Sequence, residues 1–487
     1  MRQTGTRRFG RKAGLIAAAV GVSGVLAVTS LGIGSAAPAP APASPAPASP
    51  APASPASPAP NVATPTTPAA PPPAAPDQAA KVTKVSWLTD RHVAVWVHSP
   101  AMNTDVQVQI LLARDWWAKP KDKFPQLTML DGLRARDDQN GWLLETNAEE
   151  FYKDKNVNVI LPVGGESSFY TNWLQPDRGK NYQWETFLIH ELPPILENDW
   201  RSTDVRGVEG LSMGGTAAMT LAARNPGFYK FAASFSGILQ MTSMGMPQAI
   251  QFALRDGGGY DSGKMFGAPS NPAWKEHDPY LLVDKLQGTS LYISSGNGMV
   301  GPHDKPSDIP MLATNYSGVG LELLSRVTSQ QFATKLNQSG IPGQAVYRPS
   351  GTHTWAYWQF EMSQAWPQAA GALGLSGDRP ACRTAGKIKK VYDRNRKALG
   401  ECLTPEYAVP GGRAQDFRGG RIFTGPKGPK IVTGGIGGVY ASVGGPGSKL
   451  GLPTSDELPT KDGKGRFNTF QHGKIVWTAR GGARVTK

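Results

Sequence analysis

The stretch GVEGLSMGG at residues 207–215 narrows the possible folds of this chain more than any other part of it. Gly210, Ser212 and Gly214 match the pattern G-x-S-x-G, in which a serine sits on a sharp turn between a strand and a helix. The glycines leave room for that turn, because a Cβ at either position would crowd the backbone. The stretch therefore predicts an exposed serine nucleophile.

The residues on both sides of this turn support the same interpretation. Residues 204–209 are strand-like, and residues 216–223 are a run of strong helix formers. A helix that begins just after Ser212 would direct its free N–H groups toward negative charge developing on a substrate. This arrangement favours nucleophilic catalysis over a chance glycine-rich turn.

Mostly apolar runs ending at glycine or serine recur through the middle of the chain. They indicate an antiparallel start followed by strands that alternate with helices. The expected strands are two between residues 82 and 100, then 106–112, 127–130, 157–163, 204–209, 231–235, 290–294 and 344–348. The expected helices are 216–223 and 320–336, while Pro193 and Pro194 should break a helical pattern at 184–196. The predicted fold class is α/β, an α/β-hydrolase with a mostly parallel central sheet.

A serine hydroxyl needs a base, and imidazole titrates in the useful range. The histidines after Ser212 are His277, His303, His353 and His472. His353 is the best placed of these, because it lies in a loop beyond the last expected strand and can reach over the serine.

The acid that orients this histidine has three candidates in the sequence. Asp304 and Asp308 follow the strand at 290–294, where this fold usually places the acid. Glu322 lies instead in the expected helix at 320–336. Spacing alone does not separate the three carboxylates.

The first 81 residues differ in composition from the rest of the chain. Basic residues precede an apolar run at 13–36 that ends in small residues, which predicts a secretory signal peptide at 1–36. The length of the run also leaves an uncleaved membrane anchor open. Residues 37–81 are rich in Ala and Pro and predict an extended linker.

The positive charge of the chain is concentrated near its C-terminus. The formal net charge is +14, and residues 383–487 hold 20 Lys and Arg against 7 Asp and Glu. A basic region on an exported protein predicts retention on an anionic envelope surface. No recognised nucleic-acid module accompanies the charge, so we do not expect nucleic acid as a partner.

Cys382 and Cys402 are the two cysteines of the chain. In an exported protein such a pair predicts one structural disulfide, here within a connector at 378–404 that has helical spacing. No second pair exists to build a metal site, and we expect neither a metal nor a cofactor.

Three motifs in order resemble the antigen 85 mycolyltransferases: LDGLRARDDQNGW at 130–142, GLSM at 210–213 and GTHTWAYW at 351–358. The similarity covers roughly residues 82–375, and the expected catalytic domain is 82–377. The resemblance implies an α/β-hydrolase that moves a mycoloyl chain from one trehalose monomycolate to another, or to wall arabinogalactan. The protein would then be secreted and associated with the cell wall.

The resemblance also assigns roles to individual residues. It implies Ser212 as nucleophile, His353 as base and Glu322 as acid, because the GLELL segment at 320–324 followed by Phe332 resembles the helix that carries the family's glutamate. The oxyanion donors would be the backbone N–H groups of Leu133 and Met213. The implied trehalose contacts are Asp131, Arg134, Asn140 and Trp355.

The C-terminal region resembles the LGFP repeats of envelope proteins. Residues 450–457, LGLPTSDE, match the named motif with Leu for Phe, and residues 470–475 repeat 417–422. Val485-Thr486 is expected to repeat Val432-Thr433 in the same register. We expect a small β-rich module at 405–487, with one complete and one truncated repeat, that binds arabinogalactan or another wall polymer.

Two other functions remain open from the sequence. A secreted carboxylesterase of the same fold would use the same residues with water as the acyl acceptor. A wall-binding adhesin would depend on the C-terminal repeats, but it would not need the serine, the acid and the histidine together.

Overall fold

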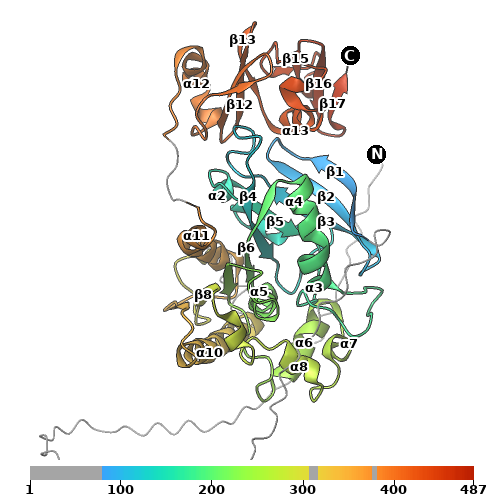
Figure 1. Cartoon of the computed structure of the whole chain (residues 1–487), viewed down its shortest axis with the longest axis vertical. Helices are drawn as coiled ribbons and strands as arrows, with labels where there is room; N and C mark the ends of the chain where they lie inside the picture. Colours follow the sequence, from blue (N-terminus) through green and yellow to red (C-terminus); the bar gives the residue numbers. More distant parts are fainter. Residues whose placement is uncertain (1–78, 306–315, 376–380, 487) are drawn as a thin grey trace, which may run out of the picture. The chain divides into compact units, whose positions relative to one another are not determined.

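The computed structural model describes residues 79–305, 316–375 and 381–486 (Figure 1). The expected signal peptide and nearly all of the expected linker lie outside these ranges. Within them, no helix is both long and apolar enough to cross a membrane.

A nine-stranded sheet forms the centre of residues 79–375 (Figure 1). Its strands, in sheet order, are β1 (Lys81–Trp87), β2 (His92–Ser99), β3 (Thr104–Leu111), β5 (Asn158–Pro162), β4 (Phe124–Leu130), β6 (Ser202–Leu211), β7 (Phe231–Phe235), β8 (Ser290–Ser295) and β9 (Gln344–Tyr347). Antiparallel pairing joins β1, β2, β3 and β5, and every pairing from β5–β4 to β8–β9 is parallel. The predicted α/β-hydrolase fold with a mostly parallel sheet is therefore confirmed.

Helices cover both faces of this sheet. Side chains of α4 (Leu192–Asp199), α5 (Met213–Arg224) and α10 (Tyr316–Gln338) belong to one apolar cluster. Side chains of α1 (Gly141–Glu145), α2 (Ala148–Tyr152) and α11 (Trp355–Ala372) belong to a second cluster. All residues of β5 and β7 are buried, which explains why these strands are nearly continuous apolar runs rather than alternating ones.

The prediction that Pro193 and Pro194 break the helical pattern at 184–196 is wrong. α3 (Trp184–Thr186) continues through a π-helical turn at Phe187–Glu191 into α4, which ends at Asp199. The prolines lie in the first turn of α4, directly after the π-helical turn, so the helical path continues past them.

Several helices were not expected from the sequence. They include α6 (Met246–Gly258), α7 (Ser262–Phe266), α8 (Pro272–Glu276) and α11. α11 begins inside the GTHTWAYW motif and contains aromatic residues and Pro367, which have low intrinsic preference for a helix. Packing of its buried face against the sheet decides its conformation instead.

The C-terminal region holds two four-stranded antiparallel sheets. The first consists of β10 (Tyr407–Val409), β11 (Gly412–Phe417), β12 (Gly420–Gly425) and β13 (Gly428–Val432). The second consists of β14 (Leu458–Pro459), β15 (Gly465–Phe470), β16 (Gly473–Thr478) and β17 (Gly482–Thr486). The helix α13 (Gly434–Ser442) follows the first sheet, and the two antiparallel sheets agree with the predicted β-rich module.

The two sheets correspond residue by residue in their second and third strands. Phe417 pairs with Gly420 in the first sheet, and Phe470 pairs with Gly473 in the second. Beyond that point the expected register is wrong, because Ile475 pairs with Val485 whereas its counterpart Ile422 pairs with Ile431. The turn before β17 is one residue longer, so Val485 is the counterpart of Ile431 rather than of Val432.

A disulfide joins Cys382 and Cys402, with a Cα–Cα distance of 5.8 Å, as predicted. The helix α12 (Gly386–Leu399) lies between them, and its residues Ile388 and Leu399 form one apolar cluster with Phe417 and Ile422. The connector therefore contributes to the core of the first repeat.

Candidate active site

Ser212 occupies a strained turn between β6 and α5. Its φ is +51°, which is unusual for a residue other than glycine. A Cβ on Gly210 would lie 2.3 Å from the carbonyl oxygen of Gly214, and one on Gly214 would lie 2.4 Å from that of Asp131. The Ser212 N–H donates to the Phe235 carbonyl at 2.8 Å. Both glycines of the motif are therefore required sterically, and the turn is held from the neighbouring strand.

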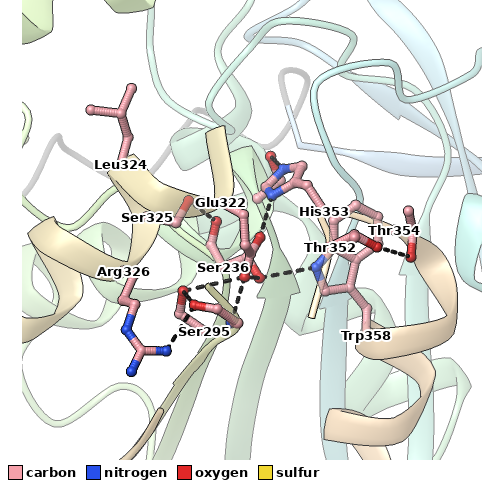
Figure 2. Close-up of polar contacts among 12 residues, drawn as sticks. Ser236, Ser295, Glu322, Leu324, Ser325, Arg326, Thr352, His353, Thr354 and Trp358 are labelled. Carbon is pink, nitrogen blue, oxygen red and sulfur yellow. Dashed lines mark hydrogen bonds and ion pairs between the residues drawn. The ribbon is translucent and has the colours of Figure 1, made fainter. Parts of the chain in front are cut away.

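His353 connects the serine to a carboxylate. It lies in the loop between β9 and α11, with Nε2 2.9 Å from Ser212 Oγ. Its Nδ1 lies 2.7 Å from Glu322 Oε2 (Figure 2). An ionised carboxylate only accepts hydrogen bonds, so Nδ1 carries the proton. Nε2 is then free to accept the proton of the serine hydroxyl.

Glu322 reaches this position from α10, and its side chain is 1% exposed. Its other oxygen, Oε1, accepts from the Gly296 N–H at 2.6 Å, from Ser236 Oγ at 2.9 Å and from Ser295 Oγ at 3.2 Å. Figure 2 shows these serines at the ends of neighbouring strands. The desolvation of this buried carboxylate is thus offset by a full set of donors.

Asp304 has other partners. Its carboxylate accepts from Thr352 Oγ1 and Tyr357 OH, both at 2.7 Å, and from the Gly301 N–H at 2.8 Å. The other candidate from the sequence, Asp308, lies outside the described residues. Of the acids that are described, Glu322 is the one that the structure brings to His353.

The remaining histidines after Ser212 are engaged elsewhere. His277 is buried and donates from Nδ1 to the Ala273 carbonyl at 2.7 Å, and burial lowers its pKa to about 4. The ring of His303 stacks on Phe360 at 4.4 Å. His472 lies in the turn between β15 and β16. Within the described ranges, no group of three or more His, Cys, Asp or Glu residues could hold a metal ion.

The two expected oxyanion donors come from distant parts of the sequence. Met213 directly follows Ser212, and Leu133 lies in an early loop. Met213 is the first residue of α5, where a backbone N–H has no acceptor within the helix. Leu133 follows Gly132, at which a Cβ would lie 3.8 Å from the Cβ of Ser212. The loop that carries Leu133 therefore packs directly against Ser212.

Two of the expected sugar contacts converge near this loop. A Cβ on Gly141 would lie 2.5 Å from Asp131 Oδ1 and 2.6 Å from the ring of Trp355, so the carboxylate and the indole approach the same point. Asp131 Oδ2 accepts from the Gly141 N–H at 2.7 Å, and Oδ1 is buried with no hydrogen-bond partner among the described residues. Burial raises the pKa of Asp131 to about 7, against the opposing effect of the Gly141 hydrogen bond.

The other two expected contacts differ in their surroundings. Arg134 is exposed and pairs with Asp256 of α6 at 2.7 Å. Asn140 is fully buried; its Oδ1 accepts from the Trp142 N–H at 3.0 Å, and its Nδ2 donates to the Pro162 carbonyl at 2.8 Å. In this structure Asn140 offers no accessible atom to a sugar, and it holds the 131–141 loop through the N-terminus of α1.

Sequence reasoning missed the residues that support Glu322. Ser236, Ser295 and Gly296 stand at the carboxyl ends of β7 and β8, where functional groups gather in parallel sheets. Polar residues directly after two buried strands were the available signal. Trp358, whose ring meets the His353 imidazole edge to face at 5.0 Å, left no separate signal in the sequence.

Two protein-family models match the chain. One, described as "Putative esterase", matches residues 99–369, and the other, described as "LGFP repeat", matches residues 399–448 and 450–487.

Curated relatives cover the first of these regions. The diacylglycerol acyltransferase/mycolyltransferase Ag85A of Mycobacterium tuberculosis is 37% identical over 288 residues, which is 58% of this chain and 81% of the relative. Ag85B of Mycobacterium intracellulare is 38% identical over 290 residues, 58% of this chain and 83% of the relative. Among solved structures, Mycobacterium tuberculosis MPT51 (FbpC1) is 26% identical with a TM-score of 0.47, covering 60% of this chain and 99% of that one.

Proposed function

Because this chain belongs to the family of the Ag85 diacylglycerol acyltransferases/mycolyltransferases and is an acyltransferase, we propose that it transfers mycoloyl chains through a serine acyl-enzyme. The donor is trehalose monomycolate, and the acceptor is a second trehalose monomycolate or arabinogalactan. The observation that carries the proposal is the hydrogen-bonded line from Ser212 Oγ through His353 to Glu322, with distances of 2.9 and 2.7 Å.

In the first half of the reaction Ser212 becomes acylated. Its hydroxyl proton passes to His353 Nε2 while Oγ attacks the ester carbonyl of the donor. The N–H groups of Leu133 and Met213 stabilise the oxyanion, and Glu322 stabilises the imidazolium. When the tetrahedral intermediate collapses, Nε2 returns the proton to the departing trehalose oxygen and the acyl group stays on Oγ.

In the second half a sugar hydroxyl replaces the departed trehalose. His353 takes the proton of that hydroxyl while the hydroxyl oxygen attacks the carbonyl of the acyl-enzyme. When the new ester forms, His353 gives the proton to Ser212 Oγ, which leaves. Transfer prevails over hydrolysis when the sugar outcompetes water at this position. Asp131, Arg134 and Trp355 supply hydrogen-bonding groups and an aromatic face for that purpose, which is chemistry suited to a polyhydroxylated acceptor.

The position of the protein in the envelope is part of the same proposal. The basic and apolar residues at 1–36 direct export, and the two LGFP repeats bind arabinogalactan or another wall polymer. The excess of Lys and Arg after residue 382 strengthens attachment to an anionic surface.

A secreted carboxylesterase is the second candidate, and the match to the "Putative esterase" model favours it. Such an enzyme would use the same three residues and the same oxyanion donors. Water, rather than a sugar, would resolve the acyl-enzyme.

Purified protein incubated with trehalose monomycolate separates the two candidates, with the products resolved by thin-layer chromatography. Formation of trehalose dimycolate and free trehalose would support acyl transfer. Formation of free mycolic acid alone would show that the enzyme hydrolyses its substrate instead. Ser212→Ala should lower the rate by about 10⁴-fold or more, because it removes the attacking oxygen. A variant that keeps parental activity would refute the serine mechanism.

A further inference from the structure

Ser236 links Glu322 to a buried tryptophan (Figure 2). It follows β7 directly and is 5% exposed. Its Oγ lies 2.9 Å from Glu322 Oε1 and 3.2 Å from Trp358 Nε1. Among the described residues, neither the Ser236 hydroxyl nor the Trp358 indole N–H is hydrogen-bonded to Ser212, and their hydrogen bonds lead to Ser212 through Glu322 and His353.

The chemistry of the three groups determines the direction of each hydrogen bond. An indole N–H only donates, and a carboxylate only accepts. The single hydroxyl proton of Ser236 must therefore point at Glu322, while its oxygen receives the N–H of Trp358. Ser295 differs, because its Oγ lies 3.2 Å from both Glu322 Oε1 and the Gly296 carbonyl, and its one proton can serve only one of them at a time.

Trp358 also contacts the other partner of Glu322. Its ring meets the His353 imidazole edge to face, with centroids 5.0 Å apart and an interplanar angle of 89°. One side chain of α11 thus restricts the plane of the imidazole and, through Ser236, the position of the carboxylate. Trp358 therefore helps to hold both His353 and Glu322, the two groups that must stay aligned.

The backbone at Ser236 is held in an unfavourable conformation. Its φ is +55°, a region that residues other than glycine rarely adopt. The Ser236 N–H donates to the Ser294 carbonyl at 2.8 Å, and Ser325 Oγ donates to the Ser236 carbonyl at 2.7 Å. The surrounding structure therefore imposes this conformation, which directs the hydroxyl at Glu322.

We propose that Ser236 is a positioning residue that fixes the Glu322 carboxylate and acts on catalysis only through it. The inference rests on the proposed function, in which Glu322 orients His353. The donated proton also stabilises negative charge on Glu322, so the proton taken from Ser212 stays on the imidazole for delivery to the leaving oxygen.

A double-mutant cycle of Ser236→Ala and Glu322→Gln tests this inference, with rates measured on an activated p-nitrophenyl ester. We expect Ser236→Ala to lower kcat by about 10- to 100-fold, as for the loss of a hydrogen bond to a charged group, with KM unchanged. In the Glu322→Gln background the same change should cost less than about threefold, because the group it acts through is already neutral. Equal losses in both backgrounds would overturn the inference.

Ser236→Gly controls for folding. Glycine adopts positive φ without strain, so it removes the hydroxyl while relieving the backbone. The loss of kcat should be the same as in Ser236→Ala, and recovery of the parental kcat in the glycine variant would overturn the inference.

Ser329→Ala is the matched control, since Ser329 is a buried serine of α10 that bonds to the Gly237 carbonyl, and we expect it to keep parental kcat. A loss there equal to that of Ser236→Ala would count against a specific role for Ser236. If Glu322→Gln itself retains parental kcat, the proposed role of Glu322 fails first, and the inference falls with it.

Discussion

Asp304 accepts a hydrogen bond from the hydroxyl of Thr352 at 2.7 Å, so its carboxylate is attached to the residue before His353 rather than to the imidazole. Its second oxygen accepts from Tyr357 OH, also at 2.7 Å, at the start of α11. Asp304 thus ties the two sides of the histidine loop together. The imidazole itself is bound by Glu322, from a helix that the usual order of this fold does not single out.

The contrast predicts different effects for the two acids. Glu322→Gln should reduce acyl transfer by roughly 10⁴-fold with little change in stability, because it removes the charge that holds the imidazole tautomer. Asp304→Asn should keep turnover within a few-fold and lower the free energy of unfolding by about 1–2 kcal/mol, since one of its accepted hydrogen bonds is lost. Steady-state kinetics and chemical denaturation of both variants provide the measurement. A crippled Asp304→Asn beside an active Glu322→Gln would exchange their roles.

Gly214 predicts a steric effect on activity. An added Cβ would lie 2.4 Å from the carbonyl oxygen of Asp131 and 2.6 Å from that of Leu130, and neither backbone atom can move without shifting the loop next to Ser212. We expect Gly214→Ala to destabilise the protein by about 1–3 kcal/mol and to lower the rate of transfer sharply.

Gly371→Ala in α11 is the control for this substitution. Among the described residues, no atom outside the adjoining backbone of α11 lies within 4 Å of the added Cβ, and alanine should stabilise the helix by up to about 1 kcal/mol. Thermal unfolding and transfer rates of the pair measure the difference. A fully active Gly214→Ala would contradict the packing described for the turn.

The buried carboxyl of Asp131 predicts a pH dependence of stability. Its pKa is about 7 in the folded protein because of burial, above the ordinary value of 3.8. Between these values the folded state holds a proton that the unfolded state releases, so the free energy of unfolding falls as pH rises, by about 1.4 kcal/mol for each pH unit. Asp131→Asn should remove this pH-dependent loss of stability. The free energy of unfolding of the variant should therefore rise relative to that of the parent as the pH goes from 4 to 7.

Glu209 supplies a comparison for the same experiment. Burial raises its pKa to about 8, and its partner is Tyr152 OH at 3.0 Å. Ionisation of Glu209 also lowers the free energy of unfolding as pH rises, but this loss extends to a higher pH than the loss due to Asp131. The loss due to Glu209 should persist in Asp131→Asn and disappear in Glu209→Gln. Denaturation curves across this range test both carboxyls. Identical slopes in the parent and Asp131→Asn would show that Asp131 does not titrate as its burial requires.

The positive charge of the repeats predicts salt-sensitive binding to cell walls. Arg480 and Arg484 are exposed in the second repeat, and changing both to Glu should weaken sedimentation with isolated walls at low salt. The difference from the parent should shrink as ionic strength rises, because salt screens exposed charges. Lys121→Glu with Lys123→Glu, which makes the same change of charge on exposed residues before β4, should have little effect. Equal weakening by both pairs would remove the specific role of the repeats.

The sequence by itself determined the parts of this protein whose chemistry is local. The steric demand of the turn at Ser212 is contained in the residues from Gly210 to Gly214, so the motif identified it directly. Apolar runs long enough to fill buried parallel strands predicted the sheet, and the pairing of Cys382 with Cys402 had no alternative in a chain with two cysteines.

Tertiary structure decided what depends on contacts between distant segments. The spacing of Asp304, Asp308 and Glu322 could not identify the acid, because which carboxylate meets His353 depends on how α10 packs beside the ends of β7 and β8. The conformation of α11 likewise follows from the apolar face it buries, against the preference of its own residues. The role of Ser236 could likewise be inferred only from the structure. Trp358 donates to its hydroxyl and Glu322 accepts from it. These two residues are far from Ser236 along the chain, and the folded sheet brings all three together.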